Sequence, residues 1–208
     1  MYLLETAREQ GAVLINARFE GIETEGGRLA RVICRRDGAL VEIETDALIL
    51  SPGPHLKSVA RAVGADVPVG VEKHVKISFP DPRGIIRRDA PLIIWNDPVD
   101  LTWSAEERDM LAESDETRWL TETMPAGFHG RPVGAGDQVV LLWSHKSELL
   151  DEPVFPIEPD QFDAEITLRG MAEVLPGLKA YLDPMPQPYV DGGYYTKTPD
   201  NRPLIGPL

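Results

Sequence analysis

The chain has 208 residues, 42% of them hydrophobic, which is enough for one large core or two smaller ones. Its net charge of -13 at pH 7 would repel nucleic-acid phosphates and anionic lipid, so we expect neither as a partner. The single cysteine, Cys34, excludes an internal disulfide and a thiolate metal cluster. No apolar run is long enough to cross a bilayer and no signal peptide is evident, so we expect a cytoplasmic location.

The first 46 residues predict a helix followed by antiparallel strands. Residues 2–10 gather their leucines on one helical face, and Gly11 suits the left-handed position that ends a helix. Alternating apolar and polar residues then predict a strand over 12–24 and a small meander to residue 46, with glycine turns between its strands.

A different pattern begins at Ala47. Residues 47–50 are apolar without alternation, which predicts a strand buried on both faces of a layered sheet. Pro54 can open the helix expected over 55–63. Together these elements predict part of a layered α/β nucleotide-binding domain over residues 1–68.

From Val69 the pattern becomes that of an antiparallel sheet with helices, which predicts a second domain over 69–190. Ser104 and Glu107 have the spacing of a capping box, so a helix is expected from residue 105, in two pieces broken near Ser114. A second helix is expected over 160–175. The predicted strands are 69–79, 90–95, 99–103, the two arms of a hairpin over 127–145, and 185–196.

Common catalytic and metal-binding signatures are missing from the sequence. The four histidines fall on separate predicted elements without the spacing of a zinc site, so no metal is expected. There is no P-loop, no Gly-x-Ser-x-Gly elbow and no Gly-x-Gly-x-x-Gly loop. Tyr194 and Tyr195 are adjacent in a predicted strand and point to opposite faces, so either one can face a ligand.

Four segments, taken in order, resemble FAD-dependent oxidoreductases of the D-amino-acid oxidase superfamily. They are residues 11–32, residues 46–54, residues 127–134 with 139–145, and DGGYYTKTPDNRPLIGP at residues 191–207. The branch with glycine oxidase, sarcosine oxidase and dimethylglycine dehydrogenase is the most similar. The resemblance implies an α/β plus α+β fold. A partial Rossmann-like FAD layer would accompany a substrate domain built on an antiparallel sheet flanked by helices, with 191–208 returning to a flavin pocket between the domains.

The resemblance also implies positions that contact FAD. Phe19 matches the stretch that brackets the adenine, and Ser51 and Gly53 match a strand end that approaches the cofactor. A tight strand-to-helix turn explains residues 51–53 equally well. Pro52 departs from the family pattern there and cannot donate a hydrogen bond. Gly193 stands where monomeric sarcosine oxidases carry the cysteine bonded to flavin, so non-covalent binding is expected. Without the family's pyrophosphate loop, this chain is expected to hold FAD weakly or not at all. Further FAD-binding candidates in the terminal motif are Arg202 and Gly206.

The candidate catalytic residues are Tyr195, Arg131 and Lys197. Tyr195 matches the position of a substrate-clamping arginine in glycine oxidases, and a tyrosine offers only one neutral hydrogen bond. Arg131 lies two residues after His129, on the same face of a predicted strand, where it can replace that clamp. Lys197 is a cationic candidate for an acidic substrate. Exposed loop or turn positions explain the two cations as well.

Relatives in this superfamily begin with a Gly-x-Gly-x-x-Gly loop and continue beyond the terminal motif with a glycine-rich loop and a helix. The resemblance therefore implies a chain truncated at both ends. Two functions stay open. The first is oxidation of a C–N bond of a small amine or amino acid by hydride transfer to FAD. The second is a non-catalytic fragment or subunit that docks with a partner supplying the missing half; a homo-oligomer is also possible.

Overall fold

The structure is a computed structural model that describes residues 2–207. The chain divides into two compact units, an N-terminal unit of residues 2–70 with 198–207, and a C-terminal unit of Val71–Lys197. Sequence patterning predicted the divisions after residue 68 and residue 190. Each unit has a buried hydrophobic cluster of its own.

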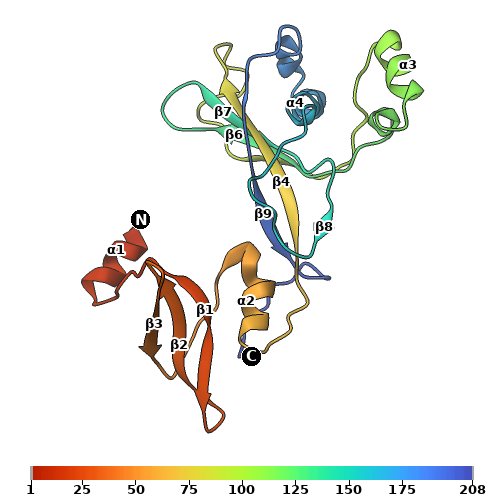
Figure 1. Ribbon diagram of the computed structural model, residues 1–208. Helices are drawn as coiled ribbons and strands as arrows, with labels where there is room; N and C mark the ends of the chain where they lie inside the picture. The colour runs from red at the N-terminus through yellow and green to blue at the C-terminus, as the bar shows by residue number, and fades with distance from the viewer. Residues whose placement is uncertain (1, 208) are drawn as a thin grey trace. The chain divides into compact units, whose positions relative to one another are not determined.

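The N-terminal unit begins with an amphipathic helix that Gly11 ends with a φ of 99°, as predicted. A three-stranded antiparallel meander follows, with strand order β1-β2-β3 (Figure 1). Ala60 of α2 packs with Val67 and Val69 in a small buried cluster. The elements are α1 (Tyr2–Glu9), β1 (Arg18–Glu25), β2 (Arg28–Arg36), β3 (Ala39–Glu44), η1 (Gly53–His55) and α2 (Leu56–Ala62).

The predicted buried strand at Ala47–Leu50 is wrong. In the structure these residues form no strand, and Ile49 is 89% exposed. Residues 12–17, expected as the start of a strand, are also irregular, and Val13 is 80% exposed. The physical reason is that a central strand needs neighbours on both sides, and no described residue pairs with either segment.

The C-terminal unit is built on a six-stranded sheet with the strand order β5-β6-β7-β4-β8, in which β9 also pairs with β4. The β6–β7 hairpin forms around the predicted turn at 134–137, whereas residues 99–103 contribute only a bridge from Val99 to Met124. The strands are β4 (Gly70–Pro80), β5 (Ile93–Trp95), β6 (Phe128–Pro132), β7 (Gln138–Leu142), β8 (Leu149–Leu150) and β9 (Tyr189–Lys197).

Helices cover one face of this sheet. The main one is α4 (Asp163–Val174), which packs on β6 and β7 and is followed by η3 (Pro176–Tyr181). The helix α3 (Ala105–Glu113), whose Glu107 pairs with Arg169 of α4 at 2.7 Å, has the predicted capping box and is separated from η2 (Arg118–Thr121), as the expected break indicated. The expected mixed α/β fold, with antiparallel sheets flanked by helices, is therefore confirmed.

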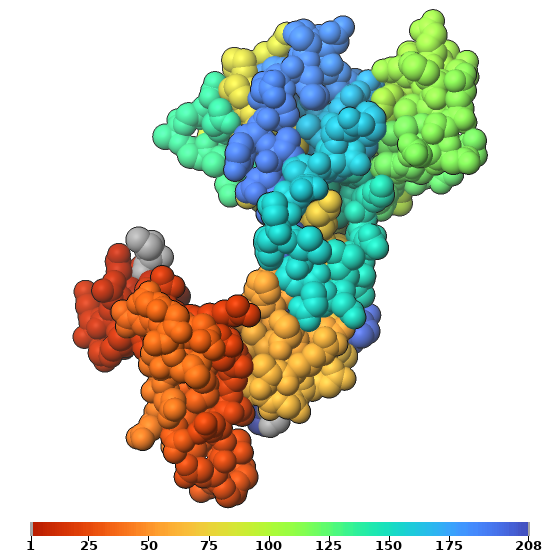
Figure 2. Space-filling model, viewed as in Figure 1, coloured from red at the N-terminus to blue at the C-terminus, as the bar shows by residue number. Residues whose placement is uncertain are grey.

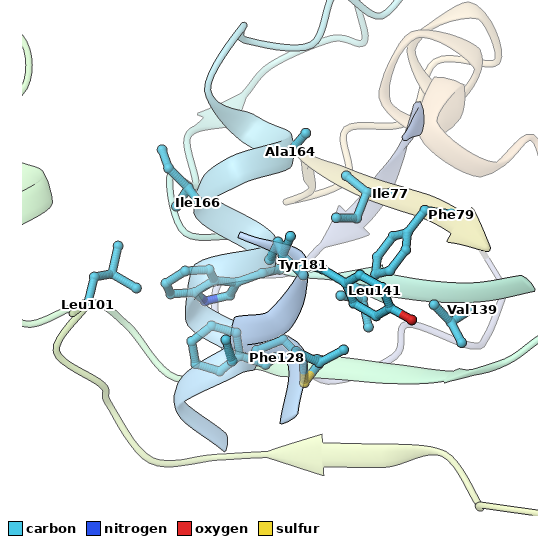
Figure 3. Close-up of a cluster of buried hydrophobic side chains, with 14 of the residues drawn as sticks. Ile77, Phe79, Leu101, Phe128, Val139, Leu141, Ala164, Ile166 and Tyr181 are labelled. Carbon is cyan, nitrogen blue, oxygen red and sulfur yellow. The ribbon is translucent and has the colours of Figure 1, made fainter. Parts of the chain in front are cut away.

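The core of the C-terminal unit lies between α4 and the sheet (Figure 3). Phe128 and Trp143 are 0% and 1% exposed, with ring centroids 3.8 Å apart. Gly170 of α4 lies directly against both rings, and a Cβ added there would be 2.2 Å from Phe128 Cε1 and 2.5 Å from Trp143 Cζ3. The missing side chain lets α4 approach the sheet this closely.

A buried polar network ties η3 to the segment that follows β4. The Asp81 carboxylate accepts hydrogen bonds from the Tyr181 hydroxyl and from the Ile86 amide, the latter at 2.8 Å. The Arg83 amide donates to the Tyr181 oxygen at 3.0 Å. Asp81 is 4% exposed and Tyr181 6%, so the network satisfies groups that have lost contact with water.

Candidate functional site

The face of the C-terminal sheet opposite α4 carries the ionisable side chains, and we call it the open face. Strand alternation produces it: Phe128 and Gly130 of β6 point to the core, and His129 and Arg131 point away from it. The open face is defined by Glu72, His74, Lys76, His129, Arg131, Asp191, Gly193, Tyr195 and Lys197.

His74 and Tyr195 lie side by side on this face. Their ring centroids are 4.3 Å apart with the planes tilted by 57°, and His74 Nε2 lies 2.6 Å from Glu72 Oε1. Tyr195 is 50% exposed. Of the two adjacent tyrosines, Tyr195 is thus the one on the open face with an accessible ring and hydroxyl.

The pKa of His74 is lowered below its ordinary value. Burial is the main cause, the hydrogen bond and charge of Glu72 oppose it, and the positive charges of Lys197 and His129 lower it slightly further. His74 is therefore neutral at pH 7 and available as a proton acceptor.

This lowered pKa has a consequence for stability. The folded chain binds a proton at His74 more weakly than the unfolded chain, so protonation favours unfolding. We expect the stability that His74 contributes to be present above the ordinary histidine value near 6.5 and to be lost as the pH falls from there through the lower folded-state pKa. Urea unfolding from pH 8 to pH 5, followed by tryptophan fluorescence, measures the loss.

The matched control is His74→Gln, which keeps a polar side chain and cannot titrate. Its urea midpoint should change less over that pH range than the midpoint of the unchanged chain. If the urea midpoint changed equally with pH in both proteins, His74 would not be the group responsible for the pH dependence. The carboxylates with a lowered pKa, such as Asp191 beside the Gly192 amide and Lys76, lose their contribution at lower pH, so the two effects separate.

The cationic side chains of the open face differ in whether they already have a partner of opposite charge. Lys76 Nζ lies 3.1 Å from Asp191 Oδ2, which neutralises it. Arg131 is exposed, and its Nη1 donates to the Pro132 carbonyl at 3.2 Å. Lys197 is half-buried at the end of β9 and near enough to His74 to affect its charge. Arg131 thus offers an accessible guanidinium for an anionic group.

Gly192 and Gly193 are not equivalent. A Cβ on Gly192 would lie 2.9 Å from Ile157 Cγ2 and 3.1 Å from the His74 carbonyl, whereas a Cβ on Gly193 would meet no atom within 4 Å. Gly193 lies on the open face, so the space directly above this position of β9 is open. A flat ring has room to approach the strand there.

The remaining predicted FAD contacts lie in the N-terminal unit. Phe19 is half-buried in β1 opposite Cys34, and Ser51 and Gly53 are exposed in the turn that enters η1. Arg202 and Gly206 are exposed in the terminal segment, where Arg202 Nε lies 3.8 Å from Asp200 Oδ2. The structure thus groups the three catalytic candidates with Gly193 in one unit and these five residues in the other.

Sequence reasoning missed His74 and the Lys76–Asp191 pair. The signal was present, because alternation over 69–79 places Glu72, His74 and Lys76 on one face of the strand. Within residues 2–207, no cluster of three or more His, Cys, Asp or Glu side chains can hold a metal ion. No helix of this part of the chain is long and apolar enough to span a membrane.

The chain has the fold of a class of oxidoreductases that includes amino-acid dehydrogenases and oxidases. The L-proline dehydrogenase of P. horikoshii matches 98% of the chain with a TM-score of 0.62 and 18% identity. The iminodiacetate oxidase of Chelativorans sp. BNC1 matches 98% of the chain with a TM-score of 0.62 and 17% identity. The glycine oxidase of Geobacillus kaustophilus matches 98% of the chain with a TM-score of 0.57 and 14% identity.

A structure of the Bacillus halodurans glycerol-3-phosphate dehydrogenase complexed with FAD matches 93% of the chain, with a TM-score of 0.61 and 12% identity. The resemblance expected from the sequence is thus confirmed at the level of the fold. The chain spans 44% of the proline dehydrogenase, 43% of each of the two oxidases and 34% of the glycerol-3-phosphate dehydrogenase, and so less than half of each. No protein-family model and no curated protein matches the sequence.

Proposed function

We propose that this chain is part of an FAD-dependent oxidoreductase that oxidises a C–N bond of a small amine or amino acid. The observation that carries the proposal is the open face, where Tyr195, His74 and Arg131 lie on a sheet that matches those of the oxidoreductases above. A reducing compartment such as the cytoplasm fits the unpaired Cys34.

Each of these side chains has a role in the proposed reaction. Tyr195 donates one neutral hydrogen bond, and Lys197, near enough to His74 to affect its charge, pairs with a carboxylate of the substrate. Arg131 is in register with Ser78, two strands from β4, so its guanidinium can meet only an anionic group at the far end of a longer substrate. Neutral His74 accepts the proton that the substrate ammonium loses before oxidation. The chemistry that bound FAD would supply is acceptance of a hydride from the substrate carbon, which leaves the substrate as a protonated imine. The protein contributes orientation and charge.

The described residues fit the flavin ring but do not fit its diphosphate. Gly193 leaves a Cβ-free approach beside Tyr195, which suits a flat ring. The entrance to α2 is a poor diphosphate site, because Pro52 and Pro54 lack amide hydrogens and α2 has seven residues. We therefore propose that ring contacts dominate flavin binding by this chain.

Flavin binding tests this directly. Riboflavin and FAD titrated into the purified chain should quench its tryptophan fluorescence with affinities within about threefold of each other. A diphosphate site would favour FAD by far more. Tyr195→Ala should weaken both, and the matched control Phe155→Ala, on another surface, should not. If neither flavin binds, the ring-contact proposal fails for this chain alone.

A second function has its own support. The N-terminal unit exposes apolar side chains in several segments, with Val13 at 80%, Ile49 at 89% and Ile205 at 94%. Large apolar side chains left exposed over several segments of one unit are what an uncovered interface would leave, provided that they form one patch. We therefore also propose that the chain works as a subunit whose partner supplies the nucleotide-binding half. Capture of a polypeptide with a Gly-x-Gly-x-x-Gly loop, which restores flavin binding when added, would support this reading, and flavin binding by the chain alone would argue against it.

A further inference from the structure

A cavity of about 670 Å³ lies in the C-terminal unit, on the side of the sheet away from the open face. Alternation separates the two: Lys73, Val75 and Tyr194 line the cavity, whereas their neighbours His74 and Tyr195 lie on the open face. The surface segment between β8 and α4 forms part of the wall (Figure 2). The volume of the cavity is in the range of small-molecule binding sites.

A buried histidine–aspartate pair lines this cavity. His145 Nε2 lies 3.3 Å from Asp163 Oδ1, and the two side chains are 5% and 8% exposed. Asp163 Oδ2 accepts the Asp160 amide at 2.7 Å. Burial raises the pKa of Asp163, but the hydrogen bonds from His145 and from the Asp160 amide lower it more, so its carboxylate is ionised.

An ionised carboxylate only accepts hydrogen bonds, so His145 must donate its Nε2–H to Asp163. In the neutral imidazole the other nitrogen, Nδ1, then carries a lone pair. Nδ1 is buried and has no hydrogen-bond partner among residues 2–207, and the same holds for the Ser144 hydroxyl. A buried acceptor without a partner costs free energy, so this site favours a molecule that brings an N–H or O–H donor.

The other groups around the cavity favour a positive charge on that donor. Its lining holds four carboxylates, Glu148, Glu158, Asp160 and Asp163, against two ammonium groups. Lys73 Nζ donates to the Glu158 carbonyl at 3.3 Å, and Lys146 Nζ lies 5.7 Å from the centroid of the Trp119 ring.

Three aromatic side chains, those of Trp143, Phe155 and Tyr194, also line the cavity. Tyr194 is held by its hydroxyl, which donates to the Val154 carbonyl at 2.9 Å. Aromatic faces and an excess of carboxylates attract organic cations.

We infer that this cavity is a second binding site, separate from the open face, for a small organic ammonium ion that donates an N–H to His145 Nδ1 after the groups covering this buried nitrogen move aside. The inference stands independently of the proposed oxidoreductase function. It uses the unsatisfied nitrogen of a buried pair, the surplus of carboxylates and the aromatic wall.

Nuclear magnetic resonance of the full chain labelled with ¹⁵N-histidine tests the inference. The four histidines give separate reports: His145 lines the cavity, His74 and His129 lie on the open face, and His55 lies in the N-terminal unit. The probe is benzylammonium at pH 8, where free imidazole is neutral. The buffer is phosphate, because Tris is itself an amine.

Benzylammonium should shift the His145 ring nitrogens in a saturable way, whether or not His74 and His129 shift as well. Benzyl alcohol, which is neutral, should bind about tenfold more weakly, and benzoate should not bind. A shift confined to His74 and His129, no saturable shift at all, or equal binding of benzoate or benzyl alcohol would overturn the inference.

Three variants of the chain complete the test. Asp163→Asn removes the buried charge that orients His145 and should weaken benzylammonium binding about tenfold. If this variant unfolds, as its tryptophan fluorescence would show, Glu158→Gln at the exposed rim tests the charge alone and should weaken binding by a smaller factor. Tyr195→Phe, on the opposite face, should leave the affinity unchanged. Equal affinity in every variant would contradict the site.

Discussion

Replacing Gly170 with alanine is expected to destabilise the C-terminal unit by about 1–3 kcal/mol. In an ordinary helix the same change stabilises by about 1 kcal/mol, because glycine is a poor helix former. Here the new methyl group would lie 2.2 Å from Phe128 Cε1 and 2.5 Å from Trp143 Cζ3. Both rings are buried, and the Trp143 indole is held by a hydrogen bond to the Pro125 carbonyl, so overpacking outweighs helix propensity.

Urea unfolding followed by tryptophan fluorescence measures this change without interference, since Trp95, Trp103, Trp119 and Trp143 all belong to the C-terminal unit. Gly136→Ala in the β6–β7 loop is the matched control, because a Cβ there meets no atom within 4 Å. It should shift the free energy of unfolding by less than about 0.5 kcal/mol. A stabilising effect of Gly170→Ala would show that the helix and sheet can move apart.

The second large effect is expected for Asp81→Ala, at about 2–5 kcal/mol of lost stability. Alanine leaves the Ile86 amide and the Tyr181 hydroxyl without their acceptor, and Ile86 is 2% exposed. Each buried group that loses its partner costs about 1–3 kcal/mol. Thermal or urea unfolding gives the difference.

Asp81→Asn separates the hydrogen bonds from the charge. Its amide oxygen can still accept from the Ile86 N–H, so it should cost less than alanine. Tyr181→Phe completes a double-mutant cycle with Asp81→Ala, and the combined cost should fall short of the sum because the two groups share one bond. Additive costs would mean that the network contributes nothing as a unit.

Local signals in the sequence predicted the elements that local interactions stabilise. Gly11 ends α1 with a positive φ, Ser104 and Glu107 form both bonds of the capping box, and the hairpin turns at 134–137. Each depends on residues within a few positions of one another. Alternation along β6 likewise placed His129 and Arg131 on one face.

Features that depend on distant partners could not be predicted in this way. Residues 47–50 have the composition of a central strand, but pairing decides whether a strand forms, and no described residue pairs with them. The contact of His145 with Asp163 needs the path of the segment between β8 and α4, which composition does not specify. The same holds for the choice between Tyr194 and Tyr195, because the Tyr194 hydroxyl forms hydrogen bonds with the backbone of Val154, forty residues away in the sequence.

The adjacent tyrosines of β9 make a single strand register responsible for two surfaces. Tyr195 contacts His74 on one side, and Tyr194 holds Val154 at the cavity on the other. Because side chains alternate, a shift of β9 by one residue would exchange the two rings and would turn Lys197 away from His74. A single insertion or deletion within β9, between Asp191 and Tyr194, should therefore disable both surfaces at once, so the two cannot diverge independently through changes of length in this strand.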